Sequence, residues 1–190
     1  MDNSSDAINN DEVIDILKEI FKNINDWLIF AETKNGVLLS INGILLFRIL
    51  DYLGESDVDN TLLNIKMIWI LIIIFLVAIL IILKSFFPNS SVLVDENNNA
   101  SGHSCNSLGI LIFYKDISKY ECSKLYLQDI YKYYLNIDID VEKLNKYELD
   151  YAKEIIINSK IACHKYKCFE YSLILNGLGI FLLILFSFIS

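Results

Sequence analysis

The chain has 190 residues, of which 54% are hydrophobic and 21% are charged, and its formal net charge is −8. The hydrophobic share is too high for an ordinary soluble domain of this size, which argues against a soluble globular protein. The acidic balance gives no support to a binder of duplex nucleic acid, because such a protein needs a basic surface. We therefore expect no nucleic-acid polymer among its partners.

The first predicted element is an amphipathic helix over 11–30. Its apolar residues recur at helical spacing, and they are Val13, Ile14, Leu17, Ile20, Phe21, Ile24, Trp27 and Leu28. The polar face is acidic, the wrong sign for anionic lipid, so we expect the apolar face to pack into a cytoplasmic bundle. Residues 1–35 are then a cytoplasmic N-terminal segment whose helix runs on towards a first membrane span.

The clearest predicted span covers 65–87. Its stretch between Lys66 and Lys84 carries no charge and is rich in Ile and Leu. A helix of this length nearly crosses a hydrocarbon layer of about 30 Å, and both Lys stems can reach the polar boundary. Pro88 follows and ends the helix.

Two further spans are predicted at 36–53 and at 171–190. The later stretch carries no charge at all, whereas Arg48 interrupts the earlier one. Arg48 lies near one end of its span, and Asp51 follows three residues on. We therefore expect Arg48 to reach the polar boundary and to pair with Asp51.

Positive charge predicts the orientation. The loop 54–64 contains three acidic residues and no Lys or Arg, whereas 84–170 contains 11 Lys. By the positive-inside rule, 84–170 and the N-terminus are cytoplasmic, and the acidic loop is external. The expected organisation is thus two spans within 36–87, a cytoplasmic helical sensing region at 88–170 and a third span at 171–190.

The cytoplasmic region contains two helical patterns, at 118–135 and at 141–169, and we expect the second to continue into the third span. Short apolar runs at 92–94 and 110–113 flank a loop rich in Asn and Ser, and they could pair as a hairpin. The sequence therefore predicts an all-α integral membrane protein. It has three transmembrane helices, a mostly helical cytoplasmic domain and room for a small β-hairpin.

A small cluster of Cys163, His164 and Cys168 could carry chemistry, and His103 and Cys105 lie elsewhere. Zinc needs about four ligands, usually from tight paired spacings, and no C-x-x-C occurs. We therefore favour free cysteines and expect no metal. No signature supports a Cys–His nucleophile pair, so we expect no enzyme, although a membrane-embedded Cys/His enzyme stays open as an alternative.

Small and polar residues recur on one face of two predicted spans. They are Gly36, Ser40 and Gly43 in the first, with Asn42 beside them, and Ser172, Asn176 and Gly179 in the third. Such faces let helices approach closely in lipid, so the first and third spans should contact protein. The second span has only Ala78 and should contact lipid. We favour helix packing for the glycines. For the asparagines, packing and a pore lined with Arg48 are equally open.

Five short motifs are spread between residues 27 and 166. They are Trp27 with Ala31-Glu32-Thr33-Lys34-Asn35; Ile41-Asn42-Gly43; Phe87-Pro88; Leu111-Ile112-Phe113-Tyr114-Lys115-Asp116-Ile117; and Ser159-Lys160-Ile161-Ala162 with Lys165-Tyr166. Together they resemble the transmembrane Pycsar effectors, which are bacterial anti-phage proteins. Glu32 and Lys115 depart from the residues that this family often has.

The resemblance implies a function. Such effectors are activated by a cyclic pyrimidine mononucleotide, cyclic UMP or cyclic CMP, and they disrupt the bacterial inner membrane, which causes abortive infection. The expected partners are the lipid bilayer, the cyclic nucleotide and further copies of the chain as a homo-oligomer, with no other cofactor. Alternatives are an immune pore-former gated by another messenger, such as a cyclic oligonucleotide, and a structural subunit of a larger membrane complex.

A site for such a ligand needs a cation for the phosphate, an aromatic face for the base and a polar group for the base edge. With the family-like motifs, side-chain type and depth suggest a set of ligand-binding residues. They are Lys34, Lys160 and Lys165 for charge, Tyr114 and Tyr166 for stacking, and Glu32 or Asn35 for the edge. The alternative for the lysines is anchoring to anionic headgroups.

Overall fold

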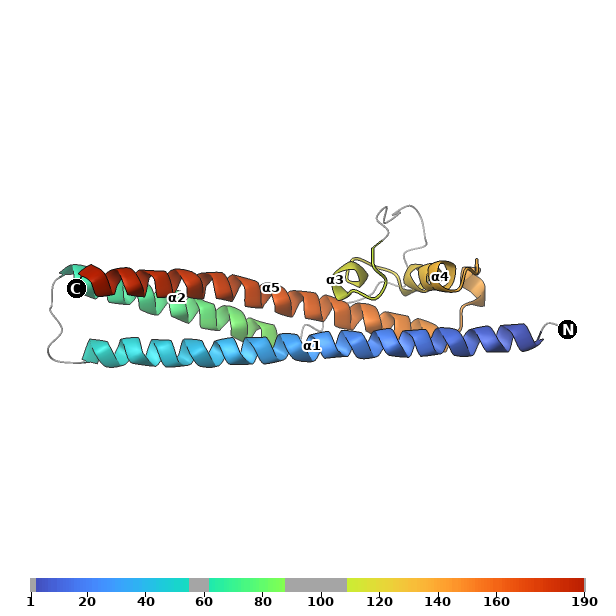
Figure 1. The fold of residues 1–190 in the computed structure, drawn as a ribbon, viewed down its shortest axis with the longest axis horizontal. Coiled ribbons are helices and arrows are strands. Elements are labelled where there is room, and N and C mark those ends of the chain that lie inside the picture. Colours follow the sequence, from blue (N-terminus) through green and yellow to red (C-terminus); the bar gives the residue numbers. More distant parts are fainter. Residues whose placement is uncertain (1–2, 55–61, 88–108, 190) are drawn as a thin grey trace. The chain divides into compact units, whose positions relative to one another are not determined.

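The computed structural model describes residues 3–54, 62–87 and 109–189, and within these ranges every regular element is a helix (Figure 1). In chain order the elements are α1 (Asn3–Gly54), α2 (Leu62–Phe86), α3 (Tyr114–Ile117), α4 (Ser123–Tyr134), the 3-10 helix η1 (Val141–Lys143) and α5 (Lys146–Ile189). The predicted all-α class is confirmed for this part of the chain.

The chain forms two compact units. The first unit comprises Met1–Ile29 and Asn89–Cys163, and the second comprises Phe30–Pro88 and His164–Ser190. Both α1 and α5 are unbroken helices that contribute to both units. This confirms that the amphipathic helix at 11–30 runs into the first predicted span, and that the helix before 171 is continuous with the third.

The first unit has an apolar core formed by the early parts of α1 and α5 together with α4. Its fully buried residues include Leu17 and Ile24 of α1, Leu127 and Ile130 of α4, and Ile155 of α5. The apolar face predicted for 11–30 therefore packs into a helical bundle, as expected from its spacing.

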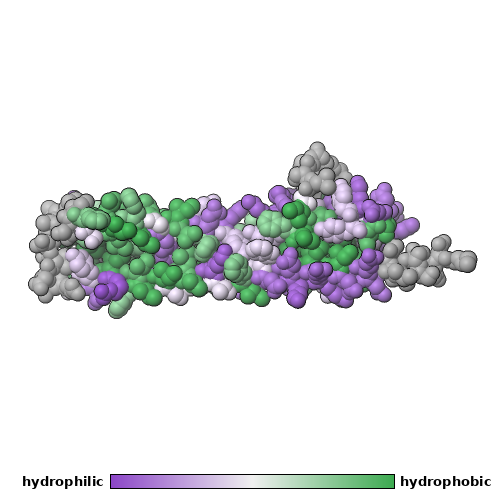
Figure 2. All heavy atoms as spheres, in the orientation of Figure 1, coloured by the Kyte–Doolittle hydropathy of each residue, from purple (hydrophilic) through white to green (hydrophobic). Residues whose placement is uncertain are grey.

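The second unit contains three long apolar helices: α2, the later part of α1 and the later part of α5. Each is long and apolar enough to cross a membrane. Its surface carries many large hydrophobic side chains, among them Phe47, Ile73 and Phe181, and Figure 2 shows this apolar surface in green. Side chains of this kind on an exterior are typical of a membrane protein, whose solvent is lipid.

The expectation that the second predicted span contacts lipid was incomplete, because α2 also packs against protein. One face of α2 is buried, and its residues are Ile68, Leu71, Phe75, Ala78 and Ile82. The Ser172 hydroxyl donates to the Ala78 carbonyl oxygen at 3.2 Å. A Cβ placed at Gly179 would lie 2.8 Å from the Phe75 ring. The small residues of α5 therefore admit α2, which needs no small residues of its own for a close approach.

Boundaries in the first unit differ from the predicted ones. The chain turns at Ile110–Phe113, where the Phe113 amide donates to the Ile110 carbonyl oxygen at 3.1 Å. Residues 92–94, the other arm of the expected hairpin, lie outside the described residues. The helix expected from 141 begins at Lys146, because Asn145 caps it by accepting a hydrogen bond from the Tyr147 amide at 3.0 Å.

Candidate functional site

Lys165 joins the three long helices of the second unit. Its side chain is only 9% exposed, and its Nζ lies 3.0 Å from Glu32 Oε1 of α1. The same Nζ donates to the Ser85 carbonyl oxygen at 3.1 Å. Ser85 is in the last turn of α2, where carbonyl groups have no partner within the helix. One ammonium group therefore pairs with a carboxylate and also caps the end of another helix.

Asn35 adds a further link between α1 and α5. Its side-chain amide donates to the Lys165 carbonyl oxygen at 3.3 Å, and the residue is fully buried. Glu32 is different, since 49% of its side chain stays exposed. The carboxylate is thus accessible from outside the cluster, whereas the ammonium of Lys165 is enclosed. We call Glu32, Asn35, Ser85 and Lys165 the polar cluster.

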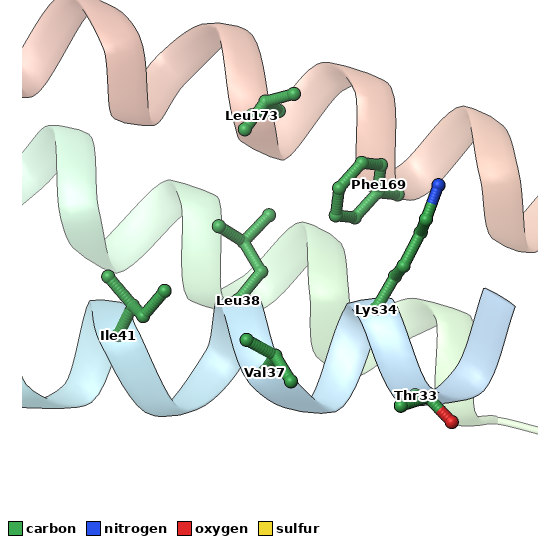
Figure 3. A pocket seen from close by; sticks show the side chains of 7 residues that line it. All are labelled: Thr33, Lys34, Val37, Leu38, Ile41, Phe169 and Leu173. Carbon is green, nitrogen blue, oxygen red and sulfur yellow. The ribbon is translucent and has the colours of Figure 1, made fainter. Parts of the chain in front are cut away.

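Lys34 lies beside the polar cluster, and aromatic rings surround its ammonium group. Its Nζ is 4.4 Å from the ring centre of Phe30, 5.6 Å from that of Tyr166 and 5.4 Å from that of Phe169. The side chain stands at the end of a groove of about 300 Å³ between α1 and α5 (Figure 3). Apart from Thr33 and Lys34, the groove lining is apolar, and it comprises Val37, Leu38, Ile41, Phe169 and Leu173.

The structure gathers five of the seven predicted ligand-binding residues in the second unit: Glu32, Lys34, Asn35, Lys165 and Tyr166. They provide two cations, one carboxylate, one amide and an aromatic ring. The other two, Tyr114 and Lys160, belong to the first unit.

Tyr114 is part of an aromatic group in the first unit. Its ring centre lies 4.8 Å from that of Phe113 and 5.5 Å from that of Trp27. Burial raises the pKa of the Tyr114 hydroxyl, and Cys163 adds a smaller effect in the same direction. Beside these rings, the Asn23 side chain donates to the Ile112 carbonyl oxygen at 3.3 Å. A half-buried aromatic face of this kind can stack on a flat base.

The two faces of small residues have different environments. On α5, Ser172, Asn176 and Gly179 are all buried, in agreement with packing inside one chain. On α1, Ser40 and Gly43 are exposed, and a Cβ at Gly36 or Gly43 would meet nothing within 4 Å. The packing within the chain that we favoured for Gly36 and Gly43 is therefore not found, and their side of α1 is an open face. The Ser40 hydroxyl donates to the Gly36 carbonyl oxygen in its own helix.

Arg48 and the buried Asn42 lie on different sides of α1, and the buried Asn176 belongs to α5. Arg48 Nη1 is 3.1 Å from Asp51 Oδ2 and both side chains are exposed, so the predicted ion pair is confirmed. Asn42 is fully buried, and Asn176 is 3% exposed. In this arrangement Arg48 does not share a lining with the asparagines.

The Cys–His cluster forms one contact of note. Cys168 Sγ lies 3.7 Å from His164 Nε2, as expected for residues four apart on a helix. Among the described residues, no three side chains of Cys, His, Asp and Glu gather in a way that could hold a metal ion. His103 and Cys105 lie outside those residues. The cluster offers no third group that would orient His164 as a base.

Sequence reasoning missed three members of the site. The Ser85 carbonyl belongs to the backbone, so no side-chain pattern could reveal it. Phe30 and Phe169 look like ordinary apolar residues of membrane helices, and only their position around the Lys34 ammonium distinguishes them. For Phe30, its place four residues before Lys34 was the available signal, whereas no sequence spacing links Phe169 to Lys34.

Comparison with known proteins gives one match. The family model described as the Pycsar effector protein domain matches residues 16–190. No curated protein and no solved structure matches the chain significantly. The match covers α1 from residue 16 onward, the whole of α2 and α5, and the whole of the candidate site.

Proposed function

The chain belongs to the Pycsar effector family, an anti-phage family linked to cyclic-nucleotide signals, and on that basis we propose a specific activity. It is a membrane effector that binds a cyclic pyrimidine mononucleotide and then disrupts the bacterial inner membrane, which causes abortive infection. It acts by rearranging its helices in lipid and performs no catalysis. Several copies act together, since one unit of three spans is too small to enclose an aqueous path.

The observation that carries the proposal is Lys165, which holds α1, α2 and α5 together through a single ammonium group. A ligand phosphate is a strong acceptor for an ammonium group and would compete with Glu32 and the Ser85 carbonyl. Loss of those contacts would free the last turn of α2. Such a ligand can shift the helices only by as much as its affinities for the two arrangements differ.

Lys34 gives the ligand its first contact in this proposal. Its ammonium faces aromatic rings and forms no ion pair with any residue that the structure describes. A phosphate could therefore bind Lys34 without first displacing a carboxylate. Tyr166 offers a face for the base, while exposed Glu32 offers an acceptor for an amino group on the base edge.

Titration of the full chain in detergent with cyclic UMP and cyclic CMP tests the proposal. Contacts between a charged group and phosphate contribute about 1.5–3 kcal/mol, so Lys34→Ala should weaken binding by about one to two orders of magnitude. Lys167→Ala is the matched control, since Lys167 is an exposed lysine on the same helix as Lys165. If Lys34→Ala, Lys160→Ala and Lys165→Ala all bind like the natural chain, the site lies elsewhere.

Leakage from liposomes tests the effector step. The natural chain should release a trapped dye only when the messenger is present. Lys165→Ala should leak without messenger, because it loses both the Glu32 pair and the bond to the Ser85 carbonyl. Lys167→Ala should behave like the natural chain. If liposomes that contain Lys165→Ala released no dye without messenger, these contacts would not be what holds the resting arrangement.

Orientation in the inner membrane, with the N-terminus cytoplasmic, follows from the charge bias. A membrane-impermeant thiol reagent applied to spheroplasts should label Ser56→Cys and leave Lys132→Cys unlabelled. Lys132 is the better reporter than the native Cys122, because Cys122 is buried and would resist the reagent on either side. Labelling of Lys132→Cys would reverse the orientation.

A further inference from the structure

Asn42 is an unusual residue for the interior of a membrane bundle. It is fully buried in the second unit, yet neither its Oδ1 nor its Nδ2 has a hydrogen-bond partner among the described residues. Asn176 is also buried. Its Nδ2 donates to the Ser172 carbonyl oxygen at 2.7 Å, whereas its Oδ1 has no partner. Three of the four amide atoms of these two side chains are thus unsatisfied.

These residues lie at a similar level in the second unit. Asn35 of α1 contacts residue 165 of α5, which is 130 positions later, and Lys34 contacts Phe169, which is 135 positions later. Since both helices rise equally per residue, Asn42 is level with positions 172–177 of α5. That window contains Ser172 and Asn176. We call Asn42, Ser172 and Asn176 the polar layer.

Packing explains only part of the polar layer. Ser172 makes a hydrogen bond to the Ala78 carbonyl oxygen of α2, so its role in this bundle is clear. Asn42 makes no such bond, and an apolar side chain in its place would leave no amide unsatisfied. In a bilayer, water cannot satisfy a polar atom that the protein leaves unpaired. Burial of Asn42 in this arrangement of the helices therefore costs free energy that its own contacts do not offset.

The exposed side of the same helix behaves differently. Ser40, two residues before Asn42, faces outward and satisfies its hydroxyl with the Gly36 carbonyl oxygen of its own helix. A polar residue that faces lipid can form a hydrogen bond of this kind within its own helix. Asn42 points inward and has no local partner, so its partner must come from a different arrangement of the helices. The amide atoms would be satisfied there by water.

We infer that the polar layer lines a water-filled ion path in the activated protein, so that membrane damage runs through a pore and not through bulk disruption of lipid. This inference rests on the proposed function and specifies its last step. The lining is neutral, because amides and a hydroxyl carry no net charge. The path should therefore pass small hydrated cations and anions with little preference between them.

The test uses the full chain in planar bilayers, opened by cyclic UMP or cyclic CMP, or by Lys165→Ala. Asn42→Asp should raise the permeability to cations over anions several-fold, since a carboxylate in a lining selects cations. Ser40→Asp is the matched control on the exposed face and should leave this ratio unchanged. Equal permeability ratios for Asn42→Asp and the natural chain in conducting membranes would overturn the inference.

A second variant keeps the inference testable if Asn42→Asp does not fold. Asn42→Cys should react with a water-soluble cationic thiol reagent only after activation and should then lose current, while Ser40→Cys and the natural chain should not. A membrane that leaks while Asn42→Cys stays unmodified overturns the pore and leaves the effector function standing. A membrane that stays intact with both messengers and with Lys165→Ala overturns the proposed function, and the pore with it.

Discussion

The two units of this protein differ in their surfaces and in how some of their buried polar groups are paired. In the first unit, two buried tyrosines have partners: Tyr131 donates to Glu148 Oε2 at 2.9 Å, and Tyr126 donates to the Leu111 carbonyl oxygen at 2.8 Å. In the second unit, large apolar side chains face outward, and buried Asn42 lacks a partner. Burial from water stabilises an apolar core such as that of the first unit, whereas in lipid packing and hydrogen bonds must replace that drive.

A single helix shows the same contrast along its length. The buried residues of α1 in the first unit are aliphatic, and they are Val13, Leu17, Ile20 and Ile24. In the second unit they are Ala31, Asn35, Leu38, Asn42 and Ile49. The helical spacing is the same, but the inner face changes from aliphatic to partly polar. The solvent around a helix, and not its periodicity, therefore decides what its inner face contains.

The largest expected effect on stability comes from truncating one fully buried Ile in each unit. Ile130→Ala in the first unit should cost about 2–5 kcal/mol, because it loses both transfer from water and packing. Ile82→Ala in the second unit should cost less, since lipid is as apolar as the interior. Both residues are fully buried, so they are a matched pair. Hydrogen exchange of the full chain in detergent reports each unit separately, and equal losses would remove the contrast.

A second comparison uses two glycines within the second unit. A Cβ at Gly179 would lie 2.8 Å from the Phe75 ring, so Gly179→Ala should destabilise the protein by about 1–3 kcal/mol. A Cβ at Gly43 meets nothing within 4 Å, so Gly43→Ala should stabilise α1 by up to about 1 kcal/mol. Thermal unfolding in detergent measures both. The same sign for the two variants would argue against the close contact between α2 and α5.

A third prediction concerns paired polar groups in the first unit. Burial and the hydrogen bond to Glu148 both raise the pKa of the Tyr131 hydroxyl, so it remains a donor throughout the physiological range. Tyr131→Phe should cost about 1–3 kcal/mol, because it leaves the Glu148 carboxylate unsatisfied. Tyr133→Phe, two residues away and exposed, is the control and should change stability little. Equal effects would show that burial of the pair does not matter.

The smallest expected effect is a pH dependence in the first unit. The hydrogen bond from Lys119 to Asp116, with a further one from the Ile110 amide, holds the pKa of this carboxyl below its ordinary value of 3.8. The ionised Asp116 carboxylate therefore stabilises the fold fully at pH values above 3.8. This stabilisation is lost as the pH falls through the lowered pKa of the folded protein.

Asp116→Asn should lower stability by up to about 1 kcal/mol at neutral pH and match the natural chain in strong acid. Hydrogen exchange around residues 110–119 measures the difference. A gap that stays constant down to acid pH would exclude the ionised carboxylate as its cause.

Much of the fold could be predicted from the sequence, because long apolar runs and helical spacing are local signals. The runs at 36–53, 65–87 and 171–190 correspond to parts of α1, α2 and α5. The partners of each span could not be predicted this way. Gly36 and Ser172 begin sets with the same spacing, yet one face is open and the other is buried. Spacing defines a face but does not say which helix covers it.

The candidate site could be approached from side-chain type alone. Lys34 and Lys165 stand out as cations near the ends of apolar runs. In the structure Lys34 lies beside the Tyr166 ring, and Lys165 belongs to the polar cluster. Their environments could not be foreseen, since Lys165 is enclosed by a backbone carbonyl and a carboxylate while Lys34 faces rings. Whether they bind a nucleotide stays a prediction.

The ion pair of Arg48 and Asp51 has a consequence for voltage. An unpaired charge that moves across a membrane exchanges about 2.3 kcal/mol with each 100 mV of potential. Arg48 and Asp51 lie 3.1 Å apart on one helix and move together, so their charges cancel in such a displacement. The same holds for Lys165 and Glu32 while they remain paired. Neither pair therefore presents a net charge for the membrane field to pull, and depolarisation alone should do little work on either of them.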